Sequence, residues 1–268
     1  MACSNGSCNS CSGCTPQNVS SVPIAGTNIN KIIGVLSGKG GVGKTMVSSL
    51  IAVGLAKAGY RVGIMDADIT GPSIPKMFGL EHTEVYGDEN GISPLVTTDL
   101  GIKVISVNMM LPDDEDPALW RGPIIGNMIK QFYTNVYWDE LDYLIIDMPP
   151  GTSDVALNVV QEIPIDGLIM VTNPGRLVNM IVAKTIKMAQ LTKVKVIGLV
   201  ENMSYIKCDD CGHEIHIYDE AAINDIVSRY HLEILAKIPL DPKLGQFCEL
   251  GNIEAITDEY LSELIKKL

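Results

Sequence analysis

A glycine-rich loop with two lysines is the segment of this sequence best suited to do chemistry. It follows the apolar run 31–36 and continues as Gly38, Lys39, Gly40, Gly41, Val42, Gly43, Lys44 and Thr45. Glycines let backbone N–H groups close around phosphate oxygens, and a lysine after the last glycine neutralises the β- and γ-phosphates. The adjoining hydroxyl is a ligand for Mg²⁺. This spacing predicts a nucleoside triphosphate site of the Walker A type.

The same glycines also fit the G-x-G-x-x-G fingerprint of a dinucleotide site. Asp66, at the end of the next apolar run, stands where a ribose-binding acid is expected. However, a dinucleotide site does not need Lys44 and Thr45. A triphosphate site does need a second acid at the end of another buried strand, and Asp147 follows the apolar residues 144–146. These features favour the triphosphate.

Lys39 is an additional lysine inside the loop. It is either a solvated loop cation or a charge directed at phosphates. In the second case it would act in the facing copy of a dimer, as an arginine finger does. The residues alone leave both interpretations open.

The seven cysteines fall into two clusters and one isolated residue. Near the N-terminus lie Cys3, Cys8, Cys11 and Cys14, and a C-x-x-C pair is formed by Cys208 and Cys211. In a reducing cytosol such clusters indicate metal or redox chemistry. Four thiolates are enough for one iron–sulfur cluster, so the N-terminal set is a candidate iron–sulfur or zinc site. We expect the isolated Cys248 to be a small buried apolar residue.

The C-x-x-C pair cannot complete a four-coordinate metal site alone. Either other ligands join Cys208 and Cys211, or two chains each contribute a pair. His213 and His216 follow closely, but one residue between Cys211 and His213 makes a single-chain tetrahedral zinc site hard to assemble. We expect the two histidines to be surface or packing residues.

Apolar runs alternate with amphipathic stretches from residue 31 onwards. We expect strands at 31–36, 61–66, 102–107, 142–147, 167–172, 194–200 and 232–237, and helices near 44–58, 122–136, 153–162, 175–191 and 219–229. This alternation predicts an α/β fold with a mostly parallel sheet and helices on both faces. Residues 81–98 are expected outside the sheet, and residues 257–268 as a helix that packs against it.

The N-terminal residues differ in composition from the rest of the chain. Residues 1–28 are rich in Ser, Asn, Gly and Cys, so we expect a flexible N-terminal tail, followed by a P-loop ATPase domain at 29–268.

With 20 Lys+Arg against 32 Asp+Glu, the net charge of −12 argues against nucleic acid or anionic membranes as partners. There is no membrane span and no signal-peptide core, which predicts a soluble cytoplasmic protein.

Several separated motifs resemble one known family. Residues 38–45 look like the deviant Walker A signature of the MinD/ParA/nitrogenase-iron-protein superfamily. Within that superfamily, five segments resemble the Mrp/ApbC family of ATP-dependent iron–sulfur cluster carriers: DADITGPS (66–73), WRGP (120–123), LDYLIIDMPPGTSD (141–154), ENMS (201–204) and CDDCG (208–212). The resemblance covers residues 28–268.

The resemblance implies roles for the nucleotide-binding residues. Lys44 and Thr45 would hold phosphate and Mg²⁺, and Lys39 would reach across a homodimer. Asp68 would orient the attacking water, with Asp66 beside it. Asp147 would bind Mg²⁺ through a water molecule, and Asn202 would contact the adenine. Such a set suits phosphoryl transfer, which depends on positioning and charge neutralisation.

The resemblance also implies a cargo. One 4Fe–4S cluster would be bridged by Cys208 and Cys211 from both subunits of a homodimer, and zinc could occupy the same sulfurs. Some family members carry an N-terminal four-cysteine motif, with longer gaps than here. The implied function is an ATPase that assembles a cluster at the dimer interface and transfers it to apo iron–sulfur proteins.

Three other functions are alternatives to this one. A ParA- or MinD-like positioning ATPase needs a basic DNA-binding face or a basic membrane helix, which the charge of −12 and an acidic terminal helix do not provide. A nitrogenase-type reductase bridges its dimer with two separated cysteines instead of a C-x-x-C pair. An ATPase with a structural zinc site is the third alternative.

Overall fold

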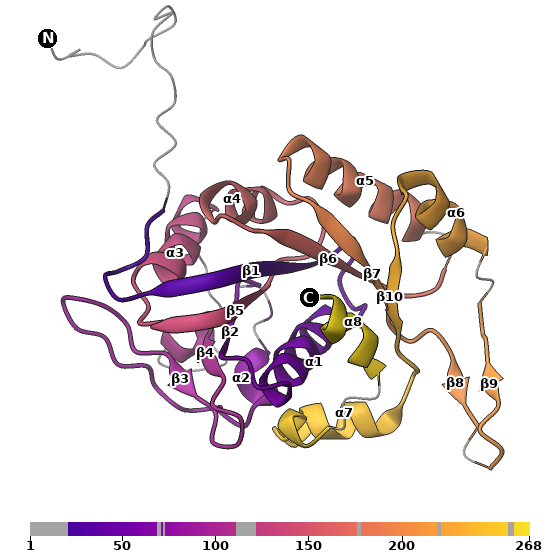
Figure 1. Cartoon of the computed structure of the whole chain (residues 1–268), viewed down its shortest axis with the longest axis horizontal. Coiled ribbons are helices and arrows are strands. Elements are labelled where there is room, and N and C mark those ends of the chain that lie inside the picture. The colour runs from indigo at the N-terminus through magenta and orange to yellow at the C-terminus, as the bar shows by residue number, and fades with distance from the viewer. Residues whose placement is uncertain are drawn as a thin grey trace, which may run out of the picture.

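A single mixed sheet forms the centre of the computed structural model, which describes residues 21–68, 71, 73–110, 122–175, 178–208, 210–218, 221–256 and 260–268 (Figure 1). Within these residues eight strands follow the order β10-β7-β6-β1-β5-β2-β4-β3. Their bounds are β1 Asn28–Ser37, β2 Val62–Asp66, β3 Leu95–Val96, β4 Lys103–Ile105, β5 Glu140–Asp147, β6 Gly167–Thr172, β7 Val196–Glu201 and β10 Ile234–Lys237. All neighbours are parallel except β3 and β4.

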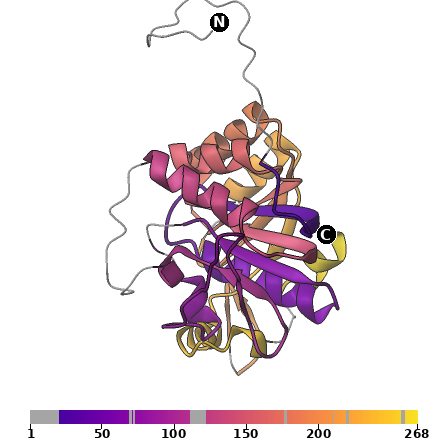
Figure 2. The same cartoon turned by 90° about the vertical axis from the view of Figure 1, so that its left-hand side faces the viewer.

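Helices cover both faces of this sheet. They are α1 Lys44–Lys57, α2 Ile74–Met77, α3 Gly122–Thr134, α4 Asp154–Glu162, α5 Val178–Leu191, α6 Ala221–Tyr230, α7 Pro242–Glu249 and α8 Ser262–Lys267, with 3-10 turns η1 Val107–Met110 and η2 Ile253–Ala255. Figures 1 and 2 show α3, α4, α5 and α6 on one face and α1, α2, α7 and α8 on the other. The predicted α/β class is therefore confirmed.

Strand β1 contributes apolar side chains to the cores on both faces of the sheet. Ile33 and Val35 belong to the core under α1, whereas Ile32 and Leu36 belong to the core under α3 and α4. Successive side chains point to opposite faces of a strand, so a strand buried on both faces needs an unbroken apolar run. This is the reason why the apolar runs located the central strands.

The seven predicted strands and five predicted helices are all present, and the differences lie at short elements. Residues 81–98 were expected outside the sheet, but Leu95 and Val96 form β3, antiparallel to β4 at the sheet edge. A two-residue strand has no periodicity to detect. The four-residue α2 was missed for the same reason, and the eight-residue α7, in which only Leu244 is fully buried, was missed as well.

The C-terminal helix packs as expected, although residues 257–259 lie outside the described residues. Leu261 and Leu264 are buried, and the Ile265 side chain lies against Gly54 of α1. A Cβ on Gly54 would stand 3.0 Å from Ile265 Cγ1, so the glycine permits this close approach. No helix in the described part of the chain is long and apolar enough to cross a membrane.

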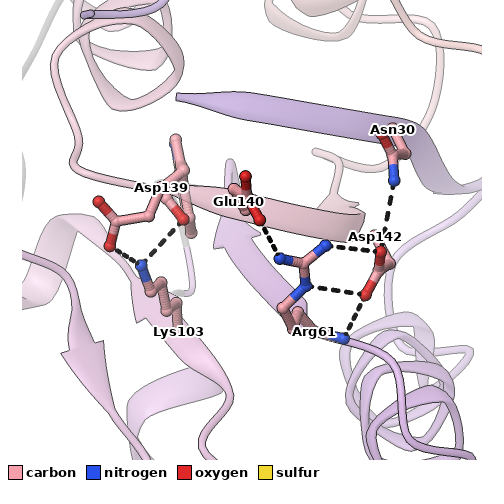
Figure 3. A network of polar contacts seen from close by, with 7 residues as sticks. Asn30, Arg61, Lys103, Asp139, Glu140 and Asp142 are labelled. Atoms are coloured by element: carbon pink, nitrogen blue, oxygen red, sulfur yellow. Dashed lines mark hydrogen bonds and ion pairs between the residues drawn. The ribbon is translucent and has the colours of Figure 1, made fainter. Parts of the chain in front are cut away.

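A polar network joins the amino ends of the central strands (Figure 3). The Arg61 guanidinium donates to both carboxylate oxygens of Asp142, each at 3.1 Å, and also to Glu140. Asn30 donates to Asp142 from β1, and Lys103 contacts Asp139 from β4. The hydrogen bonds from Arg61 lower the pKa of Asp142 to about 2. This network fixes β1, β2, β4 and β5 at the edge opposite the glycine-rich loop.

Candidate functional site

The glycine-rich loop and two acidic residues meet at the carboxyl edge of the sheet. Strand β5 lies between β1 and β2, so Asp147 is in register with Val35 on one side and Asp66 on the other. The loop leaves β1 directly after Ser37 and leads into α1. Ligands of open parallel α/β sheets bind at this edge.

The loop presents backbone N–H groups because its glycines adopt a left-handed conformation. Gly41 has φ 80° and Gly43 has φ 78°, which residues with a side chain rarely adopt. Gly43 is also the N-cap of α1, so the first free N–H groups of the helix lie at the loop. A Cβ on Gly43 would stand 2.2 Å from Asn202 Nδ2, which leaves no room for any other residue.

Lys44 is a buried lysine between two carboxylates. Its Nζ lies 2.8 Å from Asp147 Oδ2 and 3.5 Å from Asp68 Oδ2, and the side chain is only 6% exposed. These ion pairs lack the alignment of hydrogen bonds, and Nζ has no hydrogen-bond partner among the described residues. The ammonium thus keeps N–H groups that can donate hydrogen bonds to phosphate oxygens.

Asp147 is fully buried and receives two hydroxyl groups from α1. Thr45 Oγ1 donates to Oδ2 at 2.8 Å, and Ser48 Oγ donates to Oδ1 at 2.6 Å. A hydroxyl beside a carboxylate is the oxygen donor set that suits Mg²⁺. Ser48 was missed by sequence reasoning. Its spacing of four residues from Lys44, on the same helix face, is the signal that could have found it.

Asp66 and Asp68 follow β2 and add two further carboxyl groups. The Asp68 N–H donates to Asp66 Oδ1 at 3.1 Å, and Ser106 Oγ donates to Asp66 Oδ2 at 3.3 Å. Burial first, and then the charge of Asp147, raises the pKa of Asp66 to about 8. The Asp66 carboxyl is therefore mostly protonated at neutral pH.

Asn202 connects the carboxyl end of β7 to the glycine-rich loop. Its backbone N–H donates to Thr172 O, and its side-chain Nδ2 donates to Val42 O, both at 2.8 Å. The residue is completely buried, and Oδ1 has no hydrogen-bond partner among the described residues. This oxygen therefore keeps an unused acceptor position, which is closed to solvent in the nucleotide-free chain.

Lys39 stands apart from these groups. It is exposed at the tip of the loop, beside a small hollow lined by Gly38, Val42, Thr172 and Ile181. Its position leaves both interpretations open, a solvated cation or a charge offered to a second subunit.

The C-x-x-C pair lies at the end of a small hairpin beyond the edge of the main sheet (Figure 1). The hairpin consists of β8 Ile206–Lys207 and β9 Glu214–Ile215, closed by Cys208 N–H donating to His213 O at 2.9 Å. Cys208 is half-buried and Cys211 is exposed, and neither forms a disulfide with another described residue. Both are accessible to a metal ion or cluster.

The two histidines of the hairpin do not complete a metal site with these cysteines. No group of three or more His, Cys, Asp or Glu residues is placed to hold a metal within the described residues. The His216 ring instead lies 5.8 Å from the Tyr205 ring. This arrangement disfavours a zinc site of two cysteines and two histidines in one chain.

The remaining five cysteines lie away from this hairpin in the sequence. Cys248 lies on α7 and packs against the core beneath α1, as predicted, but it is half-buried and not fully buried. Burial also raises the pKa of its thiol. The four N-terminal cysteines, and Trp120 and Arg121 of the WRGP motif, lie outside the described residues.

Comparison with known proteins agrees with this geometry. The model of the ParA family, described as NUBPL iron-transfer P-loop NTPases, matches residues 28–268. The chain belongs to this family.

Relatives in this family are similar along most of their length. The chain is 42% identical to an iron-sulfur cluster carrier protein of Clostridium perfringens, covering 96% of this chain and 95% of the relative. It is 44% identical to one of Saccharolobus solfataricus, covering 84% and 76%. A solved nucleotide-binding protein of Archaeoglobus fulgidus, in complex with ADP and with Co found, has a TM-score of 0.77 at 42% identity, covering 86% of this chain and 90% of that one.

More distant structures share the fold alone. The cell division ATPase MinD of Pyrococcus furiosus has a TM-score of 0.60 at 21% identity, covering 89% of this chain and 98% of that chain. This similarity confirms the predicted P-loop NTPase fold. The family model and the relatives from Clostridium and Saccharolobus confirm the resemblance to cluster carriers.

Replacing Asp66 by asparagine should make the stability of the nucleotide-free protein less dependent on pH. The pKa of Asp66 is raised in the folded state to about 8, whereas an unfolded Asp titrates near ~4. The stability that the protonated carboxyl confers is therefore lost as pH rises towards 8, by up to about 1.4 kcal/mol per pH unit. The asparagine amide has no proton to lose in this range.

Urea unfolding of both proteins at about pH 5 and about pH 8 tests this expectation. The variant should gain stability relative to the wild type at the higher pH. An equal difference at both pH values would show that Asp66 does not titrate in this range.

Proposed function

We propose that this chain is a homodimeric ATPase that carries an iron–sulfur cluster and transfers it to apo iron–sulfur proteins. The observation that carries the proposal is the presence of both sites on one short segment. Asn202 contacts the glycine-rich loop, and Cys208 follows only six residues later. The names of the similar proteins from Clostridium and Saccharolobus support the same function.

ATP is the proposed nucleotide. The left-handed Gly41 and Gly43 and the start of α1 would bind the phosphates through backbone N–H groups, and Lys44 would neutralise the β- and γ-phosphates. Asn202 Oδ1 is an unpaired acceptor, so it suits the exocyclic amino group of adenine, whereas guanine carries a carbonyl at that position. The ADP complex of the Archaeoglobus protein is consistent with this assignment.

Mg²⁺ is the proposed metal of the nucleotide site, and the residues present fit it. The Thr45 hydroxyl and the Asp147 carboxylate are oxygen donors, and the excess of carboxyl groups over lysine favours a divalent cation. When bound, Mg²⁺ neutralises charge on the phosphates. Ser48 would keep Asp147 oriented, because it holds the second carboxylate oxygen.

Hydrolysis is proposed to depend on Asp68 and Lys39. Asp68 lies 3.5 Å from the Lys44 ammonium, which places its carboxylate next to the phosphate-binding group, where it can orient a water molecule. Lys39 is exposed on the loop, so it is free to approach the phosphates of a facing subunit. Both residues supply positioning and charge, which is what phosphoryl transfer needs.

The cluster is proposed to be shared between two chains. Cys208 and Cys211 provide two of four thiolates, and the described residues offer no further ligand beside them. The exposure of Cys211 suits a cargo that must leave. A second site at Cys3, Cys8, Cys11 and Cys14, on a tail of residues 1–28 ahead of the ATPase domain at 29–268, and a cytoplasmic location remain parts of this proposal.

Two substitutions should separate binding from turnover at the nucleotide site. Lys44→Ala should weaken ATP binding or hydrolysis by roughly 100-fold, because the charge at the phosphates is lost. Asp68→Asn should leave the Kd for ATP within about threefold of the wild type while kcat falls by roughly 100-fold. Calorimetry with ATP and phosphate release would measure both quantities.

Two results would contradict these assignments. An unchanged ATPase rate in Lys44→Ala would remove the phosphate-loop assignment. Equal losses of binding and turnover in Asp68→Asn would give that residue a role in binding the nucleotide or its metal.

Metal stoichiometry should reveal the bridging site. In a full-length chain whose four N-terminal cysteines are replaced by serine, anaerobic reconstitution should yield one 4Fe–4S cluster per two chains and strengthen dimerisation. The double change Cys208→Ala and Cys211→Ala should abolish both effects and leave ATP binding intact. Cys248→Ala is the matched control and should change neither.

Iron and sulfide analysis with absorption spectra, combined with analytical ultracentrifugation, makes this measurement. One metal centre per monomeric chain, independent of protein concentration, would contradict a bridging cluster and favour a structural zinc site.

A further inference from the structure

Glu201 is a buried carboxylate that the proposed chemistry does not use. It ends β7 between Thr172 of β6 and Lys237 of β10, and its side chain is 2% exposed. Burying a carboxylate is costly unless hydrogen bonds and an opposite charge compensate for it. Such a group needs an explanation in its surroundings.

Its partner is a hydroxyl three residues later in the chain. Ser204 Oγ donates to Glu201 Oε2 at 2.6 Å, in a buried position. Lys237 Nζ lies 3.9 Å from the same oxygen and supplies a positive charge. The hydrogen bond spans residues 201–204, so it closes the turn that contains Asn202.

The turn has an unusual backbone that this hydrogen bond holds. Met203 has φ 55°, a left-handed conformation that a residue with a side chain adopts rarely. Backbone bonds anchor the turn on either side, from Ser204 N–H to Ile238 O and from Ile238 N–H to Glu201 O, both at 2.9 Å. Met203 follows Asn202 directly, so the turn that the Glu201–Ser204 hydrogen bond closes also carries Asn202.

We propose that Glu201, through its hydrogen bond to Ser204, is a positioning residue that holds Asn202 Oδ1 ready to accept a hydrogen bond from the adenine base. This inference rests on the proposed function, since it assumes that adenine nucleotide binds at the glycine-rich loop. The Glu201–Ser204 pair affects which nucleotide base the site prefers. It does not touch the phosphates, which Lys44 and the loop bind.

The matched control is a similar hydrogen bond elsewhere in the molecule. Thr97 Oγ1 also donates to a carboxylate, Glu254 Oε1, at 2.6 Å, and Thr97 is buried as well. This pair joins the end of β3 to η2, far along the sheet from β7. Thr97→Ala therefore removes a similar interaction without affecting the turn.

Titration calorimetry of the full-length chain with ADP and with inosine diphosphate, which lacks the amino group, tests the proposal. The wild type should prefer ADP by about tenfold. Ser204→Ala and Glu201→Ala should reduce this preference to about twofold or less by weakening ADP binding, with inosine diphosphate binding unchanged. Glu201→Gln, which keeps an acceptor oxygen, should retain most of the preference, and Thr97→Ala should retain all of it.

The outcomes separate this inference from the function on which it rests. A wild-type preference that persists in Ser204→Ala, the variant that removes a single oxygen atom, overturns the positioning role and leaves the proposed function standing. A loss of preference in Thr97→Ala as well overturns it too, because a general loss of stability would then explain the effect. A wild-type chain that binds neither nucleotide overturns the proposed function itself.

Discussion

The arrangement of the rest of this site depends on the ion pairs of Lys44 with Asp147 and Asp68. Parallel pairing of β2 with β5 places Asp66 beside Asp147, and the segment after β2 returns Asp68 to the same lysine. One buried ammonium thus faces several carboxyl groups. This imbalance raises the pKa of Asp66, and it supports the proposal that a divalent cation binds here. The glycine-rich loop, Thr45 and Ser48 are arranged around this cluster of charge.

A second dependence links the nucleotide site to the cysteines. Residues 201–208 leave β7 at the carboxyl edge, pass the loop at Asn202 and enter the hairpin of Cys208. Leu240 N–H donates to Tyr205 O at 2.7 Å, so this segment is also tied to the chain that follows β10. A change at the base of the nucleotide therefore has a short covalent path to the thiols. This path is the physical basis for the proposed link between ATP binding and the holding of a cluster.

Much of this architecture could be predicted because its physical causes are local. Central strands such as β5 and β6 are buried on both faces and read as unbroken apolar runs, and the loop motif requires glycine at fixed positions. The spacing of Ser48 from Lys44 places it on the same helix face, but its partner Asp147, 99 residues away, is shown only by the structure. Glu201 could not be assigned a role from the sequence, since its partner Ser204 lies in a turn with an uncommon backbone. The 3.5 Å approach of Asp68 to Lys44 likewise depends on how β2 and α1 pack together. Short elements such as β3 and α2 carry too few residues for a pattern.

We propose that nucleotide at the Lys44 site controls a cluster held by Cys208 and Cys211. The most direct measurement is the rate at which anaerobically reconstituted protein transfers its cluster to an apo-ferredoxin, with and without Mg-ATP. Mg-ATP should change this rate by at least about fivefold in the wild type, and it should have no effect in Lys44→Ala. Equal rates with and without Mg-ATP in the wild type, from protein that binds both ATP and the cluster, would contradict the account.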